Sequence, residues 1–230
     1  MKQGGNLMLK LSILFIAIAI HWLLAWFWVP VDQMQGEVYK IIYLHVPSAF
    51  AAFWCAGVLF VVSILSLRNS QASRYVQLGK AATEVGLIFT ILTLATGSIW
   101  GKPTWGTWWT WDARLTTTLL LSLLFVGWLL LHNSMDSGPS RNRSCAILGI
   151  LIGADVPIIY KSVTFWRTLH QPQTILRPGG GTSTMDPDML IVLVSGVVLM
   201  VVVAQFLILE RRKNIELDAE LTELSLNGGQ

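Results

Sequence analysis

Long apolar runs, separated by short polar or aromatic segments, make up most of this chain. A transmembrane α-helix needs about 20 mostly apolar residues, and six runs come close to or exceed this length. The runs cover residues 11–29, 42–67, 82–100, 115–132, 144–163 and 189–209. The pattern therefore predicts an all-α integral membrane protein with six transmembrane helices. Residues 1–210 would form a single membrane domain, followed by a short tail at 211–230.

The overall composition supports this class of protein. Hydrophobic residues make up 53% of the chain and charged residues only 13%, whereas soluble domains average about 25% charged residues. The first apolar run follows Lys2 and Lys10, but it ends in the aromatic residues Trp26, Phe27 and Trp28 instead of a small-residue cleavage site. We therefore expect a retained transmembrane helix and not a removed signal peptide.

The distribution of Lys and Arg predicts the orientation in the membrane, because cytoplasmic loops are enriched in these residues. Ten of the 16 lie at the N-terminus, in the second and fourth loops and in the tail, and the other six lie on the opposite side. This bias places both termini in the cytoplasm. The same excess of cytoplasmic Lys and Arg explains the net charge of +3, so the charge does not indicate a nucleic-acid partner.

The segment between the third and fourth spans, which this topology places on the outer face, is rich in tryptophan. Residues 105–111 read WGTWWTW and contain four of the 11 tryptophans. On a helix, Trp105, Trp108, Trp109 and Asp112 would follow the spacing i, i+3, i+4 and i+7, while Trp111 would face away. The three tryptophans at 105, 108 and 109 would then form an indole stripe, and the Asp112 carboxylate would lie at its end.

An irregular turn is the alternative for this segment, because Gly101, Pro103 and Gly106 weaken helical structure. In both cases the segment presents a rigid aromatic surface, which suits a large, flat, conjugated ligand. Anchoring at the membrane interface explains scattered tryptophans such as Trp22 and Trp128, but it explains this cluster poorly.

Two histidines lie on the same predicted face as the tryptophan-rich segment. His45 occurs in YLHVPSA at the outer end of the second span, and His170 occurs in FWRTLHQPQ within the loop 164–188. A single interfacial histidine is more often a packing or hydrogen-bonding residue than a ligand. Two histidines that flank an aromatic surface favour the axial ligation of haem iron. Zinc is less well suited, because no close His or Cys partners follow the spacing of structural zinc sites.

Basic residues on this face could bind the haem propionates, although each could also be an ordinary interfacial cation. The candidates are Lys102, Arg114, Arg167 and Arg177. The other two histidines, His21 and His132, lie at different depths and do not form a second pair. A CxxC motif is absent from the sequence, which argues against thiol redox chemistry.

Residues 100–116, WGKPTWGTWWTWDARLT, resemble the tryptophan-rich WWD signature of membrane haem-handling proteins. Within that group, YLHVPSA around His45, SVTFWRTLHQP around His170, the six spans and the chain length are similar to the CcmC family of the cytochrome c maturation system. The sequence departs from the usual pattern at Phe165, where tryptophan is expected, and at Asp155, where an uncharged polar residue is expected. Phe165 bears on the shape of the last loop but not on the two histidines.

The resemblance implies a haem-handling or transport subunit of the bacterial inner membrane, and not an enzyme. Such proteins hold haem b at the periplasmic face through two axial histidines, which match His45 and His170. They deliver the haem to the chaperone CcmE, and they act in a membrane complex with the ATPase CcmA, with CcmB and with CcmD. The remaining residues expected around the cofactor are Trp100, Trp105, Trp108, Trp109, Trp111, Asp112, Arg114 and Trp166.

Three other functions stay open at this point. A bis-histidine electron-transfer protein, such as a quinol-linked subunit, would be expected to carry a second histidine pair, which the sequence lacks. A haem-conducting permease would need polar groups at several depths, and within the spans only His21 and Asp155 stand out. A purely structural role for the tryptophans, as a membrane anchor, leaves the two histidines unexplained.

Overall fold

The structure is a computed structural model that describes residues 2–69, 73–171 and 185–227. Six α-helices in these ranges are long and apolar enough to cross a membrane, which confirms the predicted all-α class and the six spans. The helices are α1 (Lys2–Leu23), α2 (Ile42–Arg68), α3 (Ser73–Trp105), α4 (Ala113–Ser134), α5 (Pro139–Phe165) and α6 (Pro187–Asn227). A π-helix, Leu24–Trp28, extends α1, and a 3-10 helix, Glu37–Ile41, precedes α2.

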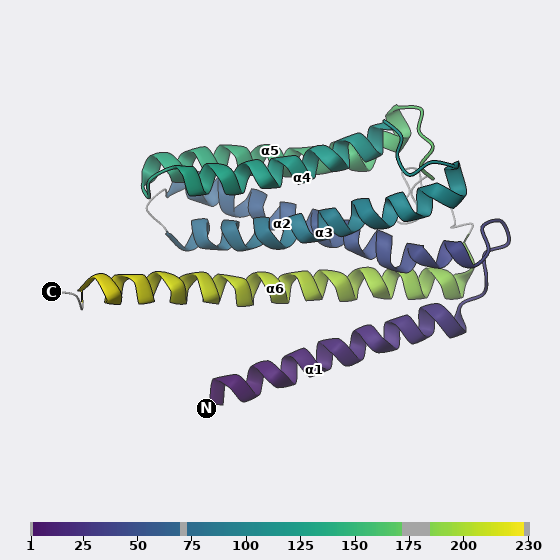
Figure 1. Ribbon diagram of the computed structural model, residues 1–230, viewed down its shortest axis with the longest axis horizontal. Coiled ribbons are helices and arrows are strands. Elements are labelled where there is room, and N and C mark those ends of the chain that lie inside the picture. Colours follow the sequence, from purple (N-terminus) through teal and green to yellow (C-terminus); the bar gives the residue numbers. More distant parts are fainter. Residues whose placement is uncertain (1, 70–72, 172–184, 228–230) are drawn as a thin grey trace.

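Helices α2 and α3 lie in the middle of the bundle, with α4 and α5 on one side and α6 on the other (Figure 1). Helix α1 lies beyond α6 and diverges from it toward the N-terminus (Figure 1). The start of α1 and the end of α6 point toward the same end of the bundle, as the even number of spans requires. Segments 29–36, 106–112 and 166–171 lie together at the opposite end. Helix α6 continues through the predicted tail to Asn227.

The tryptophan-rich segment is irregular beyond Trp105, so the helical stripe considered for residues 105–112 does not form. Gly106 ends α3 in the left-handed region, at a φ of 77°, and its N–H donates to the Lys102 carbonyl over 3.1 Å. This is a common way to end a helix, because glycine has no Cβ to oppose a positive φ. The chain then runs without helical hydrogen bonds until Asp112, which caps the start of α4.

Two glycines of α5 allow α2 to approach closely. A Cβ added at Gly149 would lie 2.1 Å from Ser63 Oγ, and one added at Gly153 would lie 2.5 Å from Phe60 Cδ2. Small residues at spacing i, i+4 are the usual means of close helix packing in membranes, where van der Waals contact replaces the hydrophobic effect. The α2–α5 contact therefore depends on both glycines.

We expect Gly153→Ala to lower the melting temperature of the detergent-solubilised protein. The added methyl group would overlap the Phe60 side chain, and overpacking of this kind typically costs about 1–3 kcal/mol. Gly127→Ala is the matched control, because a Cβ there meets no atom within 4 Å. Equal melting temperatures for the two variants would show that the α2–α5 contact tolerates a larger residue.

Candidate functional site

A cavity of about 630 Å³ lies between the helix ends and loops that carry the tryptophan-rich segment. Its volume is within the range of small-molecule and cofactor sites, which is roughly 300–1,000 Å³. Much of its wall is apolar, with Phe50 and Phe53 from α2, Leu94 from α3 and Leu115 from α4. Among the residues predicted from the sequence, the cavity brings together His45, Trp100, Trp105, Trp109, Arg114 and His170.

The two histidines face each other across a short distance. His45 lies in the first turn of α2 and His170 in the loop after α5, yet their ring centroids are 6.2 Å apart and their planes differ by 33°. A metal-bound imidazole nitrogen lies about 2 Å from its metal and about 1 Å from its own ring centroid, so two rings on opposite sides of one metal have centroids about 6 Å apart. The observed separation therefore fits two ligands to one ion.

The hydrogen bond of His45 fixes its tautomer. His45 Nδ1 lies 3.0 Å from Thr96 Oγ1, and the Thr96 hydroxyl donates its proton to the Leu92 carbonyl over 2.7 Å. The Thr96 oxygen must therefore accept, so Nδ1 of His45 carries the hydrogen and Nε2 keeps a lone pair. Gly97 admits the ring, because a Cβ at this position would lie 3.0 Å from His45 Cε1. This arrangement is typical of metal-binding histidines, whose second ring nitrogen usually donates to a nearby acceptor.

The contacts of His170 favour the same tautomer. Its Nδ1 lies 3.0 Å from the Gln171 carbonyl, which can only accept, and 3.3 Å from Arg114 Nη1, which can only donate. The shorter contact favours donation from Nδ1 to Gln171, which leaves Nε2 with a lone pair and the guanidinium beside the ring as a close positive charge. Burial, reinforced by Arg114, lowers the pKa of His170 to about 4. The imidazole is therefore neutral at physiological pH, as a metal ligand must be.

Asp112 joins the start of α4 to the loop that carries His170. Its Oδ1 accepts from the backbone N–H groups of Arg114, at 2.8 Å, and Leu115, at 3.4 Å. Its Oδ2 accepts from the Thr168 hydroxyl and from the Leu169 N–H, the latter at 2.9 Å. Burial acts to raise the pKa of Asp112, but these hydrogen bonds outweigh it and keep the pKa below its usual value. The predicted carboxylate of the tryptophan-rich segment thus positions the loop and does not line the cavity.

Three of the predicted tryptophans form walls of the cavity. The Trp100 ring lies edge-on to His45 with centroids 5.8 Å apart, and its Nε1 donates to Gln35 Oε1 over 2.7 Å. The Trp105 centroid is 6.3 Å from that of His170, and Trp109 lines the cavity between α3 and α4.

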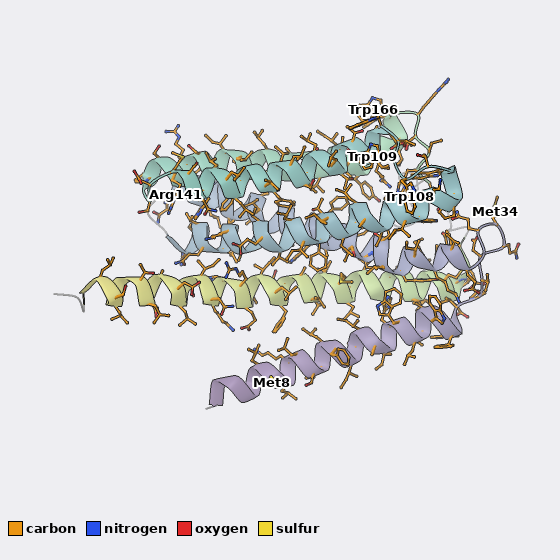
Figure 2. The ribbon with its side chains drawn as sticks, viewed as in Figure 1. Met8, Met34, Trp108, Trp109, Arg141 and Trp166 are labelled. Carbon is orange, nitrogen blue, oxygen red and sulfur yellow. The ribbon has the colours of Figure 1, made fainter. Side chains whose placement is uncertain are left out.

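The other three predicted tryptophans lie outside the cavity wall and are exposed: Trp108, Trp111 and Trp166. Figure 2 places Trp108, Trp109 and Trp166 at one end of the bundle, opposite Arg141. The six tryptophans therefore divide into an inner wall and an exposed rim.

Arg114 lines the cavity, unlike the other described cations that were candidates for the propionates. Its Nη2 donates to the Tyr160 carbonyl over 3.1 Å, whereas its buried Nε has no acceptor among the described residues. Lys102 donates to the Gly106 carbonyl and Arg167 is exposed, while Arg177 lies outside the described residues. A buried guanidinium N–H without an acceptor fits a site for an anionic group.

Several residues of the site gave no clear signal in the sequence. Thr96 and Gln35 are ordinary polar residues, and they meet His45 and Trp100 across 51 and 65 positions of chain. Thr168, whose hydroxyl also accepts from the His170 N–H over 3.0 Å, could have been found from its place two residues before a candidate ligand.

Other metal chemistry finds little support in the described ranges. No group of three or more His, Cys, Asp and Glu side chains there could hold a metal ion. Both cysteines, Cys55 and Cys145, are buried and free. A pair of histidines alone suits a metal whose other ligands arrive with it, as they do in haem.

Comparison with known proteins agrees with this geometry. The family model "CcmC: Heme exporter protein C" matches residues 3–226. "Heme exporter protein C" of Bradyrhizobium diazoefficiens is 41% identical over 164 residues, which are 70% of this chain and 60% of that protein. The protein of the same name from Escherichia coli K12 is 38% identical over 176 residues, or 76% and 69% of the two chains. A ccmC-like mitochondrial protein of cytochrome c biosynthesis from Marchantia polymorpha is 40% identical over 154 residues, or 66% and 64%.

We expect Asp112→Asn to release the loop at Thr168 while α4 stays capped. Asparagine is as good an N-cap as aspartate, but its amide offers one acceptor oxygen where the carboxylate offers two. The Thr168 hydroxyl and the Leu169 N–H then lose the oxygen that binds them. Trypsin should therefore cleave after Arg167 about ten-fold faster than in the parent. Asp32→Asn is the matched control, since Asp32 accepts from Met34 and Gln35 in a different loop. Unchanged cleavage after Arg167 would contradict this role of Asp112.

Proposed function

Because the chain belongs to the CcmC family of haem exporter proteins, we propose that it binds haem b in the cavity and passes it to the chaperone CcmE for cytochrome c maturation. His45 and His170 are the axial ligands of the iron. Trp100, Trp105 and Trp109 pack around the macrocycle, and Arg114 binds a propionate. The protein acts as a haem-binding subunit, and the covalent chemistry belongs to the chaperone and the cofactor.

The pairing of the two histidines is the observation that carries this proposal. The imidazole centroids lie at the separation that one shared metal requires, and both rings have Nδ1 bound to an acceptor and Nε2 available. When bound, haem would supply an iron that accepts nitrogen ligands and an anionic, aromatic periphery. The chain supplies the complementary parts, which are two neutral imidazoles, indole walls and a guanidinium with a free N–H.

The proposed location is the bacterial inner membrane, with the cavity at the periplasmic face. The end of the bundle that holds the cavity is opposite the end that carries Arg141 and the termini (Figures 1 and 2). The positive-inside rule assigns the latter end to the cytoplasm. A site at the outer end of the helices is open to a soluble domain of a partner, as delivery to CcmE requires. CcmA, CcmB and CcmD are the proposed partners in the membrane complex.

Electron transfer across the membrane is the weaker alternative. His21 contacts the Tyr43 backbone near the cavity end, whereas His132 stacks on Trp128, with centroids 5.3 Å apart, near the other end of the bundle. The two do not form a second ligand pair, so the four histidines provide for one haem. Haem reduction by quinol would favour this alternative, and haem flux through vesicles that contain this protein alone would favour a permease.

We expect the purified protein, expressed with its haem supply intact, to show the visible absorption spectrum of a six-coordinate haem. His45→Ala and His170→Ala should each change or abolish this spectrum, because each removes one axial ligand. His132→Ala is the matched control, since it removes a histidine from the other end of the bundle. Identical spectra for all four proteins would refute the ligand assignment.

We expect Arg114→Gln to weaken haem binding about ten-fold, because it removes a charge-assisted hydrogen bond to a carboxylate. Haem dimethyl ester, which lacks the propionate charges, should bind the parent and this variant equally. Lys102→Gln serves as the control cation, because Lys102 is exposed and bonded to its own loop. A loss of the same size for haem and for its ester would show that Arg114 acts by packing alone.

A further inference from the structure

We propose that His21 is a positioning residue that fixes the first turn of α2 and thereby directs His45 into the cavity. The inference goes beyond ligand binding, but it rests on the proposed function because His45 is assigned there as an axial ligand. His21 belongs to α1, lines no part of the cavity and is only 7% exposed. Its effect on the site must therefore act through the backbone of α2.

Pro47 leaves a gap in the hydrogen bonding of α2. In an α-helix the N–H of residue i donates to the carbonyl of residue i−4, so the donor for the Tyr43 carbonyl would be residue 47. Proline has no N–H, and its ring also crowds that carbonyl. The residue is nonetheless inside the helix, which runs from Ile42 to Arg68. Since Tyr43 is buried, its carbonyl needs another donor.

His21 supplies that donor from a different helix. Its Nε2 lies 3.3 Å from the Tyr43 carbonyl oxygen, and because a carbonyl can only accept, Nε2 carries the hydrogen. The two aromatic rings are also in edge contact, with centroids 6.4 Å apart. The bond thus joins α1 to α2 at a carbonyl that Pro47 has released.

Helix α6 is shaped to admit the His21 ring. A Cβ added at Gly196 would lie 2.4 Å from His21 Cε1 and 2.8 Å from its Nε2. The imidazole is therefore held between the backbone of α6 and the first turn of α2. Elsewhere α1 packs loosely, since residues 7–20 are all exposed or half-buried, and it diverges from α6 toward the N-terminus (Figure 1). His21 is a principal attachment of α1 to the bundle.

The position of this bond connects it to the ligand. Tyr43 precedes His45 by two residues, and both lie in the one turn that Pro47 leaves without its regular hydrogen bond. If the Tyr43 carbonyl lost its donor, the turn would have to rotate to find another, because a buried acceptor without a partner is costly. That rotation would change the direction of the His45 ring relative to Thr96 and to His170.

The test compares His21→Leu, which removes the donor at similar volume, with His21→Gln, whose side-chain amide keeps a donor near the position of Nε2. We expect His21→Leu to alter the electron paramagnetic resonance signal of the ferric haem. This variant should also release haem to apoglobin about ten-fold faster than the parent, because leaving one buried acceptor unpaired has an effect of about that size. His21→Gln should stay close to the parent. If both variants match the parent, or if both are impaired equally, the proposal is wrong.

A second background tests the role of Pro47. Pro47→Ala restores the N–H that binds the Tyr43 carbonyl, so His21→Leu should cause little further change in this background. An equal effect of His21→Leu in both backgrounds overturns the proposal. If His21→Leu alone yields no monodisperse protein, the double variant decides: recovery of folded protein supports the proposal, and continued failure contradicts it.

The same measurements separate this inference from the function on which it rests. A parent protein whose haem spectrum is unaffected by His45→Ala would refute the proposed function. If His45→Ala loses the haem spectrum but His21→Leu keeps the parent's electron paramagnetic resonance signal and rate of haem release, only the role of His21 is refuted.

Discussion

The need to pair every backbone polar group governs this structure, because the bilayer interior offers no water to replace a missing partner. The constraint is most demanding at the cavity end, where helices stop, loosen or contain proline. At three such points a side chain supplies the missing partner. Asp112 accepts from the first N–H groups of α4, and Lys40 Nζ donates to the Trp26 carbonyl within the π-helix, at 2.9 Å. The Tyr43 carbonyl, released by Pro47, is bound by His21.

The same pairing prepares the two histidines for their proposed role. Thr96 accepts from His45 because its own proton is already used on the backbone of α3, and Gln171 accepts from His170. These contacts hold both rings and favour Nε2 as the free nitrogen. The Asp112 carboxylate adds a tie from α4 to the loop of His170, at Thr168 and Leu169. Preorganisation of this kind lowers the cost of binding, because the ligands need not be ordered when the cofactor arrives.

The sequence was sufficient to predict the fold and to name some of the residues that line the candidate site. The six spans followed from the length of the apolar runs, and the approach of His45 to His170 followed from their shared predicted face. The conformation of residues 105–112 could not be decided from periodicity, because Gly106 ends the helix and the stripe spacing applies only to a helix. Contacts such as Thr96 to His45 could not be predicted, since they depend on the register of α3 against α2. The division of the tryptophans between wall and rim depends on the same loop geometry.

That division bears on how a cargo can be held and still be released. Trp100 is 8% exposed and is tied to Gln35, so one wall of the cavity is rigid. Trp108 and Trp111 are 57% and 78% exposed on a loop without helical hydrogen bonds, so the rim is accessible to a partner. In the proposed role, the two neutral imidazoles would bind the iron, and Arg114, which lines the cavity, would meet the anionic groups. A resident cofactor is usually enclosed on all sides, whereas a rigid wall combined with an open aromatic rim suits a haem that is presented and then handed on.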